Sequence, residues 1–256
     1  MESVRAYSHY LTMKGQFIGL TAIDGHKPTV EEIEVRSEIR RACDHMARVL
    51  STCTATDIAS LTGYYSILYT IGYSRMPETT LLEKQRDRLL RLWQSGDRTI
   101  EESDVYGLLS DSMNNPQSAM PQATRRTFDR LRDGWVRTLK QHGTFPGTDT
   151  YERYRRLALI MRDNIDPWFG GNSTAAKRRW YETNRIADIS TLGTKILTAY
   201  RQFLCSLFPA VLSASEMTRL DVAVLKELTA RRDLDPYDRR AYQLALEHES
   251  RREKCE

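Results

Sequence analysis

The sequence predicts an all-α protein in two lobes, a helical bundle of about eight to nine helices. Apolar residues recur at helical spacing almost everywhere after Pro28. A strand-like alternating pattern occurs only between Gln16 and Ile23. Two prolines interrupt the helical pattern within residues 114–121, and we interpret this segment as a linker between the lobes.

Local start signals help to place the individual helices. Ser213 to Ser215 precede Glu216, and Asp235 is followed by Pro236, which is favoured in a first helical turn. Thr99 stands before a pair of glutamates and is the expected cap of an earlier helix. The predicted helices are 30–52, 56–73, 78–95, 100–113, 122–142, 150–165, 174–208 with a break near Gly193, 214–231 and 236–252.

These segments define four regions of the chain. Residues 29–113 form an N-terminal helical lobe, 114–121 the linker, and 122–256 a basic centre followed by a C-terminal helical lobe. Residues 1–28 are too apolar for a free tail. Either they pack on their own lobe, or they act as an arm that docks onto a neighbouring copy and allows self-association.

Residues 56–113 and 192–249 have related sequences, which indicates an internal duplication. Sliding the chain by 136 residues aligns LTGYYSIL (61–68) with LTAYRQFL (197–204), and further identities follow as far as residue 108. The alternative is two similar amphipathic helix sets, because leucines at helical spacing match one another readily.

Composition excludes several classes of protein. A length of 256 residues with 40% apolar content can bury a core, and no apolar run is long enough to span a membrane. The first residues lack a signal-peptide pattern. The four cysteines show no metal-binding or disulfide spacing. We therefore expect a soluble, intracellular protein, cytoplasmic or nuclear, with no structural metal and no cofactor.

Basic residues are concentrated in the middle of the chain. Of 38 basic residues 30 are arginine, and 14 of the 38 lie between Gln122 and Arg185 beside only 7 acidic residues. Arginine binds phosphate with two parallel hydrogen bonds, and the aromatic residues interleaved here can stack on unpaired bases. The residues predicted to bind nucleic acid are Arg125, Arg126, Arg130, Tyr154, Arg155, Arg156, Lys177, Arg178, Arg179 and Trp180.

The alternative for this basic centre is structural. Its aromatic residues would face the core, while its arginines would form a solvated face paired with nearby acidic residues such as Asp129, Asp133 and Glu152. Both alternatives stay open at the level of the sequence.

A glycine-containing loop precedes one of the basic helices. Gly170, Gly171, Ser173 and Thr174 lead into the helix that carries Lys177 to Arg179. A helix start offers free backbone N–H groups, so this loop predicts an anion pocket. The alternative is an ordinary loop in which Ser173 or Thr174 caps the helix. The P-loop spacing is absent, so nucleotide hydrolysis is not implied.

No catalytic motif is present, since HExxH, DDxxD and GxSxG are all missing. The sequence therefore predicts a non-catalytic protein that binds nucleic acid, with single-stranded RNA as the expected ligand. Its size, helicity and basic centre are similar in outline to helical viral nucleoproteins and matrix-type structural proteins, although no motif is shared. The alternatives are a scaffold that binds acidic partners or anionic lipid, and an enzyme or small-molecule sensor with a pocket between the lobes.

Overall fold

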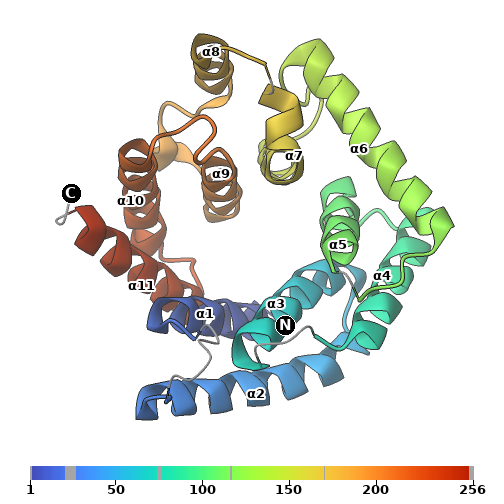
Figure 1. Cartoon of the computed structure of the whole chain (residues 1–256), viewed down its shortest axis with the longest axis vertical. Helices are drawn as coiled ribbons and strands as arrows, with labels where there is room; N and C mark the ends of the chain where they lie inside the picture. Colours follow the sequence, from blue (N-terminus) through green and yellow to red (C-terminus); the bar gives the residue numbers. More distant parts are fainter. Residues whose placement is uncertain (1, 21–26, 74–76, 116, 170, 254–256) are drawn as a thin grey trace. The chain divides into compact units, whose positions relative to one another are not determined.

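The computed structural model describes residues 2–20, 27–73, 77–115, 117–169 and 171–253. All regular structure in these residues is helical, with eleven α-helices, one short 3-10 helix and no strand (Figure 1). The all-α prediction is therefore confirmed. None of the described helices is long and apolar enough to cross a membrane.

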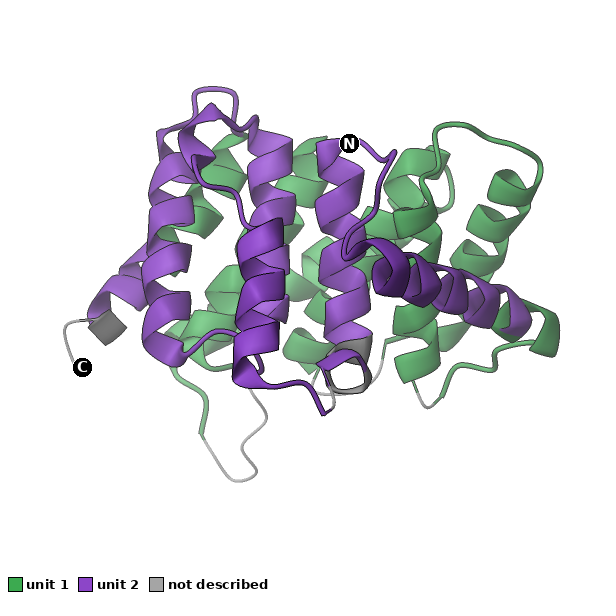
Figure 2. Ribbon diagram, turned by 90° about the horizontal axis from the view of Figure 1, so that it is seen from above, with its two compact units in different colours: residues 1–125, 235–245 green, residues 126–234, 246–256 purple. Residues whose placement is uncertain are grey.

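The chain forms two compact units, which Figure 2 shows in separate colours. Unit 1 comprises residues 1–125 and 235–245, and unit 2 comprises residues 126–234 and 246–256. Two helices, α6 (Gln122–His142) and α11 (Pro236–Glu253), therefore contribute residues to both units. The predicted linker, residues 114–121, falls near the end of the first segment of unit 1, and its Pro116 lies outside the described residues.

Unit 1 is built around one central helix, α3, which packs against α1, α2, α4 and α5. The apolar residues of α3 lie on all its sides, as a helix surrounded by others requires. Its side chains Ile58, Leu61 and Leu68 are fully buried. The bounds of the helices are α1 (Glu2–Ile18), α2 (Val30–Leu50), α3 (Ala55–Tyr73), α4 (Thr79–Gln94) and α5 (Glu102–Asn114).

Two arginines of α4 hold neighbouring segments of unit 1 in place. Arg86 is 1% exposed, and it donates hydrogen bonds to the Asp87 carboxylate and to the Ala119 carbonyl oxygen. Arg88 donates to the carbonyl oxygens of Leu50, the last residue of α2, and of Cys53, which follows the helix. Helix ends leave such carbonyl groups without partners inside the helix, so Arg88 satisfies them from α4.

The N-terminal segment contains a helix that the sequence did not predict. Helix α1 packs on α2 and α3 and buries Ala6 and Leu11. A Cβ at Gly15 would lie 3.0 Å from the Ile71 side chain, so the glycine allows α1 to approach α3 closely. Of the alternating stretch, residues 16–18 are helical, and residues 21–23 lie outside the described part.

The count of eight to nine helices is too low for two reasons. Helix α1 is one addition. The other is the predicted segment 174–208, which forms α8 (Thr174–Asn184), a 3-10 helix (Ile189–Thr191) and α9 (Thr194–Ser206). Gly193 caps α9, so the break near it is confirmed, although the interruption already begins at Arg185.

The start signals were partly correct. Ser213 caps α10 (Ala214–Ala230) in a capping box with Glu216, as expected. Thr99 does not cap α5, because Glu101 is the N-cap residue and forms a capping box with Asp104. Thr99 instead donates its backbone N–H and its hydroxyl to the Asp97 carboxylate, which closes the preceding turn.

Unit 2 is a layered set of helices from α6 to α10, including α7 (Thr150–Phe169). Helix α9 packs against α7 on one side and α10 on the other. The core between them includes Leu157, Met161, Phe203, Leu204 and Leu225, all fully buried. This packing fixes the faces that α7, α8 and α10 present to one another and to solvent.

The two segments of the suggested duplication each contain three helices in the same order. Residues 56–113 lie wholly within unit 1, whereas residues 192–249 are divided between the units at Leu234 and Ala245. The duplication stays a prediction.

We expect Gly72→Ala to destabilise the protein by about 1–2 kcal/mol. The new Cβ would lie 2.6 Å from the Ile39 side chain, which is fully buried and cannot move away. The matched control in the same helix is Gly63→Ala, where no atom lies within 4 Å of the new Cβ. That change should stabilise α3 by about 0.5–1 kcal/mol. Urea denaturation of both variants is the measurement, and a stabilised Gly72→Ala would contradict the packing.

Candidate anion-binding site

Helix α6 carries basic residues on one face and buried apolar residues on the other. Phe128, Leu131, Trp135 and Leu139 recur at helical spacing and are buried. The opposite side bears four exposed cations, which we call the cationic face of α6. They are Arg126, Arg130, Arg137 and Lys140.

The acidic neighbours of this face pair with a different arginine. Arg132 contacts Asp129 at 3.0 Å and Asp133 at 3.1 Å. Within the described residues, Arg126 and Arg130 have no ion-pair partner. Arg125, the last residue of the first segment of unit 1, is likewise exposed. The cationic face of α6 therefore keeps its charge available to ligands.

The two aromatic residues predicted to stack on bases lie in a cluster of rings. This aromatic cluster consists of Tyr154, Phe169, Trp180, Tyr200 and Phe203, with ring centroids 5.1–6.1 Å apart in its contacting pairs. Tyr154 is 5% exposed and donates its hydroxyl to the Asn184 carbonyl oxygen at 2.7 Å. Trp180 donates its indole N–H to the Gly143 carbonyl oxygen at 2.9 Å.

These contacts give both side chains a structural role. Burial leaves the ring of Tyr154 no face for a base, and it also raises the pKa of this phenol to about 12. Trp180 is half-buried, and its indole N–H is already used. Tyr154 is therefore part of the core, whereas Trp180 keeps part of its surface exposed.

Arg155 and Arg156 are also held by contacts within unit 2. Arg156 donates to the Glu152 carboxylate at 2.7 Å, and its guanidinium lies 5.1 Å from the Trp135 ring centroid. Arg155 donates to the Tyr151 hydroxyl at 3.1 Å. Both arginines are half-buried, so they stabilise α7 more than they face solvent.

Helical geometry separates the three consecutive cations of α8. Successive residues of a helix point about 100° apart. Lys177 accordingly lies over the Phe169 ring, Arg178 reaches Glu216 of α10, and Arg179 is exposed. These three side chains do not grip one anion together.

The glycine loop before α8 is built as a helix cap. The Ser173 hydroxyl accepts the Ala176 N–H at 3.2 Å, and Gly171 has a left-handed backbone with φ of 77°. Thr174 is exposed at the first turn, and Gly170 lies outside the described residues. Because Arg178 turns towards α10, it does not supply this loop with a cation.

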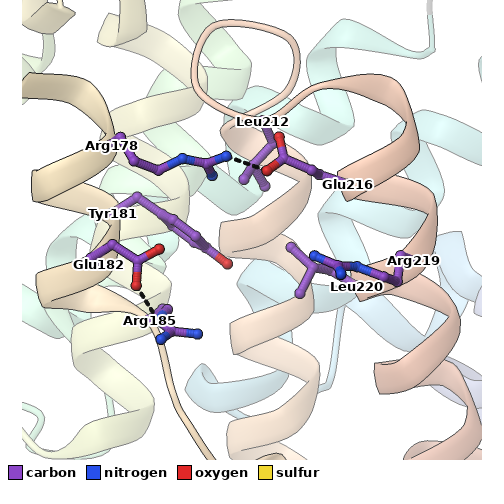
Figure 3. Close-up of a pocket in the computed structure, with 8 residues that line it drawn as sticks. All are labelled: Arg178, Tyr181, Glu182, Arg185, Leu212, Glu216, Arg219 and Leu220. Carbon is purple, nitrogen blue, oxygen red and sulfur yellow. Dashed lines mark hydrogen bonds and ion pairs between the residues drawn. The ribbon is translucent and has the colours of Figure 1, made fainter. Parts of the chain in front are cut away.

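A pocket does exist on the other side of Arg178, between α8 and α10 (Figure 3). It has a volume of about 230 Å³. Tyr181 and Arg185 follow Arg178 at spacings of three and seven residues and share its side of α8, while Glu216, Arg219 and Leu220 share one face of α10. Three guanidinium groups thus line one small pocket.

The acidic residues of the pocket are Glu216 and Glu182. Arg178 pairs with Glu216 across the pocket, and Arg185 pairs with Glu182 along α8, as the dashed lines in Figure 3 show. The hydrogen bond from Arg178, together with those from Ser213, lowers the pKa of Glu216 to about 2. Glu216 is therefore ionised throughout the neutral range, and the pocket has one more positive than negative group.

Buried groups form the inner wall of this pocket. Tyr181 is 5% exposed, its hydroxyl is hydrogen-bonded to that of Tyr200, and burial raises its pKa to about 12. Tyr200 accepts the Ile186 N–H at 3.2 Å and belongs to the aromatic cluster. Leu212 adds an apolar side chain. The wall is buried and neutral, and the arginine and glutamate side chains lie around it.

Nowhere among the described residues do three His, Cys, Asp or Glu side chains gather closely enough to hold a metal ion. Burial also raises the pKa of the Cys43 thiol to about 12 and makes it unreactive.

No family of proteins, no curated protein and no solved structure matches this chain. The cationic face of α6 and the pocket are the two candidate sites of the described residues.

Several functional candidates were missing from the sequence prediction. Arg137 and Lys140 could have been found, because they continue the spacing of Arg126 and Arg130 along α6. Arg185 and Arg219 could not, since the pocket joins residues about 40 positions apart in the chain. No local pattern signals such a pairing.

We expect Glu216→Gln to reduce the acid sensitivity of the protein. A carboxylate whose pKa is lowered by folding stabilises the folded state above its unfolded pKa, and this contribution is lost as the pH falls to the folded value. The free energy of unfolding should thus fall more steeply in the wild type than in the variant between pH 4.5 and 2. Glutamine keeps the capping function.

Denaturant titrations at several pH values measure this difference. Glu34→Gln is the control, because Glu34 is an exposed carboxylate of unit 1. Parallel pH profiles for the wild type and Glu216→Gln would show that the Arg178–Glu216 pair does not stabilise the fold.

Proposed function

We propose that this protein binds single-stranded nucleic acid, RNA in the first place, without catalysis and with little sequence preference. The binding surface lies on unit 2, and its main element is the cationic face of α6. The observation that carries the proposal is that Arg132 forms ion pairs with both aspartates beside this face. The cations of the face therefore remain available for phosphates.

The charge of the units supports the same assignment. Unit 2 contains 22 basic and 16 acidic residues, whereas unit 1 contains 16 basic and 18 acidic residues. A positive potential of this kind attracts polyanions and speeds their encounter with the protein. Arg126 and Arg137 are about 16 Å apart along α6 at 1.5 Å per residue, which is long enough to contact several successive phosphates.

An exposed aromatic side chain in unit 2 can supply the stacking contact. Phe208, in the turn after α9, is 46% exposed. Aromatic rings hold unpaired bases without regard to sequence, at about 1–3 kcal/mol per base. We assign to Phe208 the stacking role that the buried Tyr154 cannot fill.

Self-association through residues 1–28 is not part of this proposal. Helix α1 packs on α2 and α3 within unit 1, which uses its apolar residues. A polymerising arm would need that side for a second copy.

We expect the triple variant Arg126→Gln, Arg130→Gln, Arg137→Gln to weaken RNA binding and to make it less dependent on salt. Each phosphate contact contributes about −0.7 to the slope of log K against log salt concentration for single strands. Loss of three contacts should make the slope shallower by about 2. Fluorescence anisotropy with a labelled mixed-sequence 20-mer RNA, between 50 and 300 mM salt, measures this slope.

The matched control removes three exposed arginines from unit 1, as Arg48→Gln, Arg91→Gln, Arg98→Gln. Both triple variants lower the net charge equally, so only a local binding surface distinguishes them. Equal slopes for the two variants, or no RNA binding by the wild type, would reject the proposal. If the protein instead retains a protein partner at 300 mM salt and in the presence of competing oligonucleotides, it is a protein scaffold.

A further inference from the structure

We infer that the pocket between α8 and α10 is a binding site for a phosphate monoester, held by Arg178, Arg185 and Arg219. Nucleic acid is one source of this group, and to that extent the inference rests on the proposed function. A small phosphorylated molecule is the other source. In both cases the recognised chemistry is the same terminal phosphate.

The guanidinium groups of the pocket can be recruited at low cost. Arg219 is exposed and has no ion-pair partner among the described residues. In the part of the chain that the structure describes, Arg185 has Glu182 as its one ion-pair partner, and both of these side chains are nearly half exposed. Exposed pairs of this kind contribute little to stability, so an incoming anion competes with water more than with a strong bond.

Arg178 can also leave its partner while α10 remains capped. Glu216 uses its two carboxylate oxygens for different purposes: Oε1 accepts from Arg178, while Oε2 accepts the backbone N–H and the hydroxyl of Ser213. If Arg178 turns to a phosphate, the bonds of Oε2 remain and α10 stays capped. Glu216 therefore acts as a built-in competitor that a stronger anion can displace.

The size of the pocket suits a small charged group better than a whole enclosed ligand. Its volume of about 230 Å³ is below the range of roughly 300–1,000 Å³ typical of sites that enclose a whole small molecule. A phosphate group with a single ester arm fits, with the remainder of the ligand outside. An internal phosphodiester has two arms and one charge fewer, so it cannot use the three guanidinium groups as well.

The competing carboxylate makes the pocket selective for charge. An anion must interact with Arg178 more strongly than Glu216 does, and a doubly charged phosphate with three acceptor oxygens meets this condition better than chloride. The buried, neutral wall of Tyr181 and Leu212 excludes water on one side and strengthens the interaction.

Isothermal titration of the full-length protein with inorganic phosphate at pH 7.5 tests the site. Chloride at equal ionic strength is the reference ligand. We expect saturable binding of phosphate, weakened at least about tenfold by Arg219→Gln and by Arg178→Gln. Since Arg219 is exposed, its replacement leaves the fold intact.

Two further variants should not weaken phosphate binding. Glu216→Gln should bind phosphate at least about threefold more tightly, because the competing charge is gone. Arg179→Gln, on the same helix but outside the pocket, should bind as the wild type does. No saturable binding, an equal loss in Arg179→Gln, or weaker binding by Glu216→Gln would each overturn the inference.

Oligonucleotides identify the source of the phosphate. RNA 10-mers with a 5′-phosphate or a 5′-hydroxyl are added as competitors of inorganic phosphate. Competition by the 5′-phosphate form alone assigns the strand end to the pocket. Competition by neither form assigns a small phosphorylated molecule, and equal competition by both overturns the selection of terminal phosphate. Because inorganic phosphate is measured directly, failure of RNA binding would leave this test intact.

Discussion

The aromatic cluster of unit 2 determines which basic side chains are left for ligands. Trp180 is fixed in this cluster by Phe203, Phe169 and its bond to the Gly143 carbonyl oxygen. Lys177, three residues earlier, is drawn over Phe169 on the same side of α8. The adjacent residue Tyr181 must then point about 100° away, and Arg178 shares its direction. The orientation of the pocket residues is therefore a result of core packing.

Charge alone does not distinguish a ligand surface from a solvated one. Helix α6 shows the difference within a few turns: Arg132 is occupied by two aspartates, whereas Arg126 and Arg130 on the neighbouring stripe have no such partners among the described residues. In α7, Arg156 lies between a carboxylate and aromatic rings and belongs to the packing. A count of basic residues therefore overestimates the number of cations without an acidic partner, and the positions of the acidic residues must be considered as well.

The fold class and the capped starts were predictable because they depend on local sequence, as Ser213 and Glu216 illustrate. Helix α1 was missed because regular helical spacing was recognised only after Pro28, while Gln16 to Ile23 show an alternating pattern. The Arg178–Glu216 pair joins residues 38 positions apart, so only the packed helices reveal it. The exposed cations of α6 lie between these cases, because the sequence prediction included Arg126 and Arg130 but not Arg137 and Lys140, which continue their spacing.

Unit 1 is discontinuous in sequence, because residues 235–245 complete it after the chain has passed through residues 126–234. Asp238 accepts a hydrogen bond from His9 at 2.8 Å, and Tyr237 lies 4.9 Å from Tyr7 between ring centroids. During synthesis on the ribosome, α1 to α5 emerge long before these partners exist. The N-terminal helices therefore lack these contacts while most of unit 2 is translated, and a nascent chain that ends before residue 235 leaves the surface around Tyr7 and His9 uncovered.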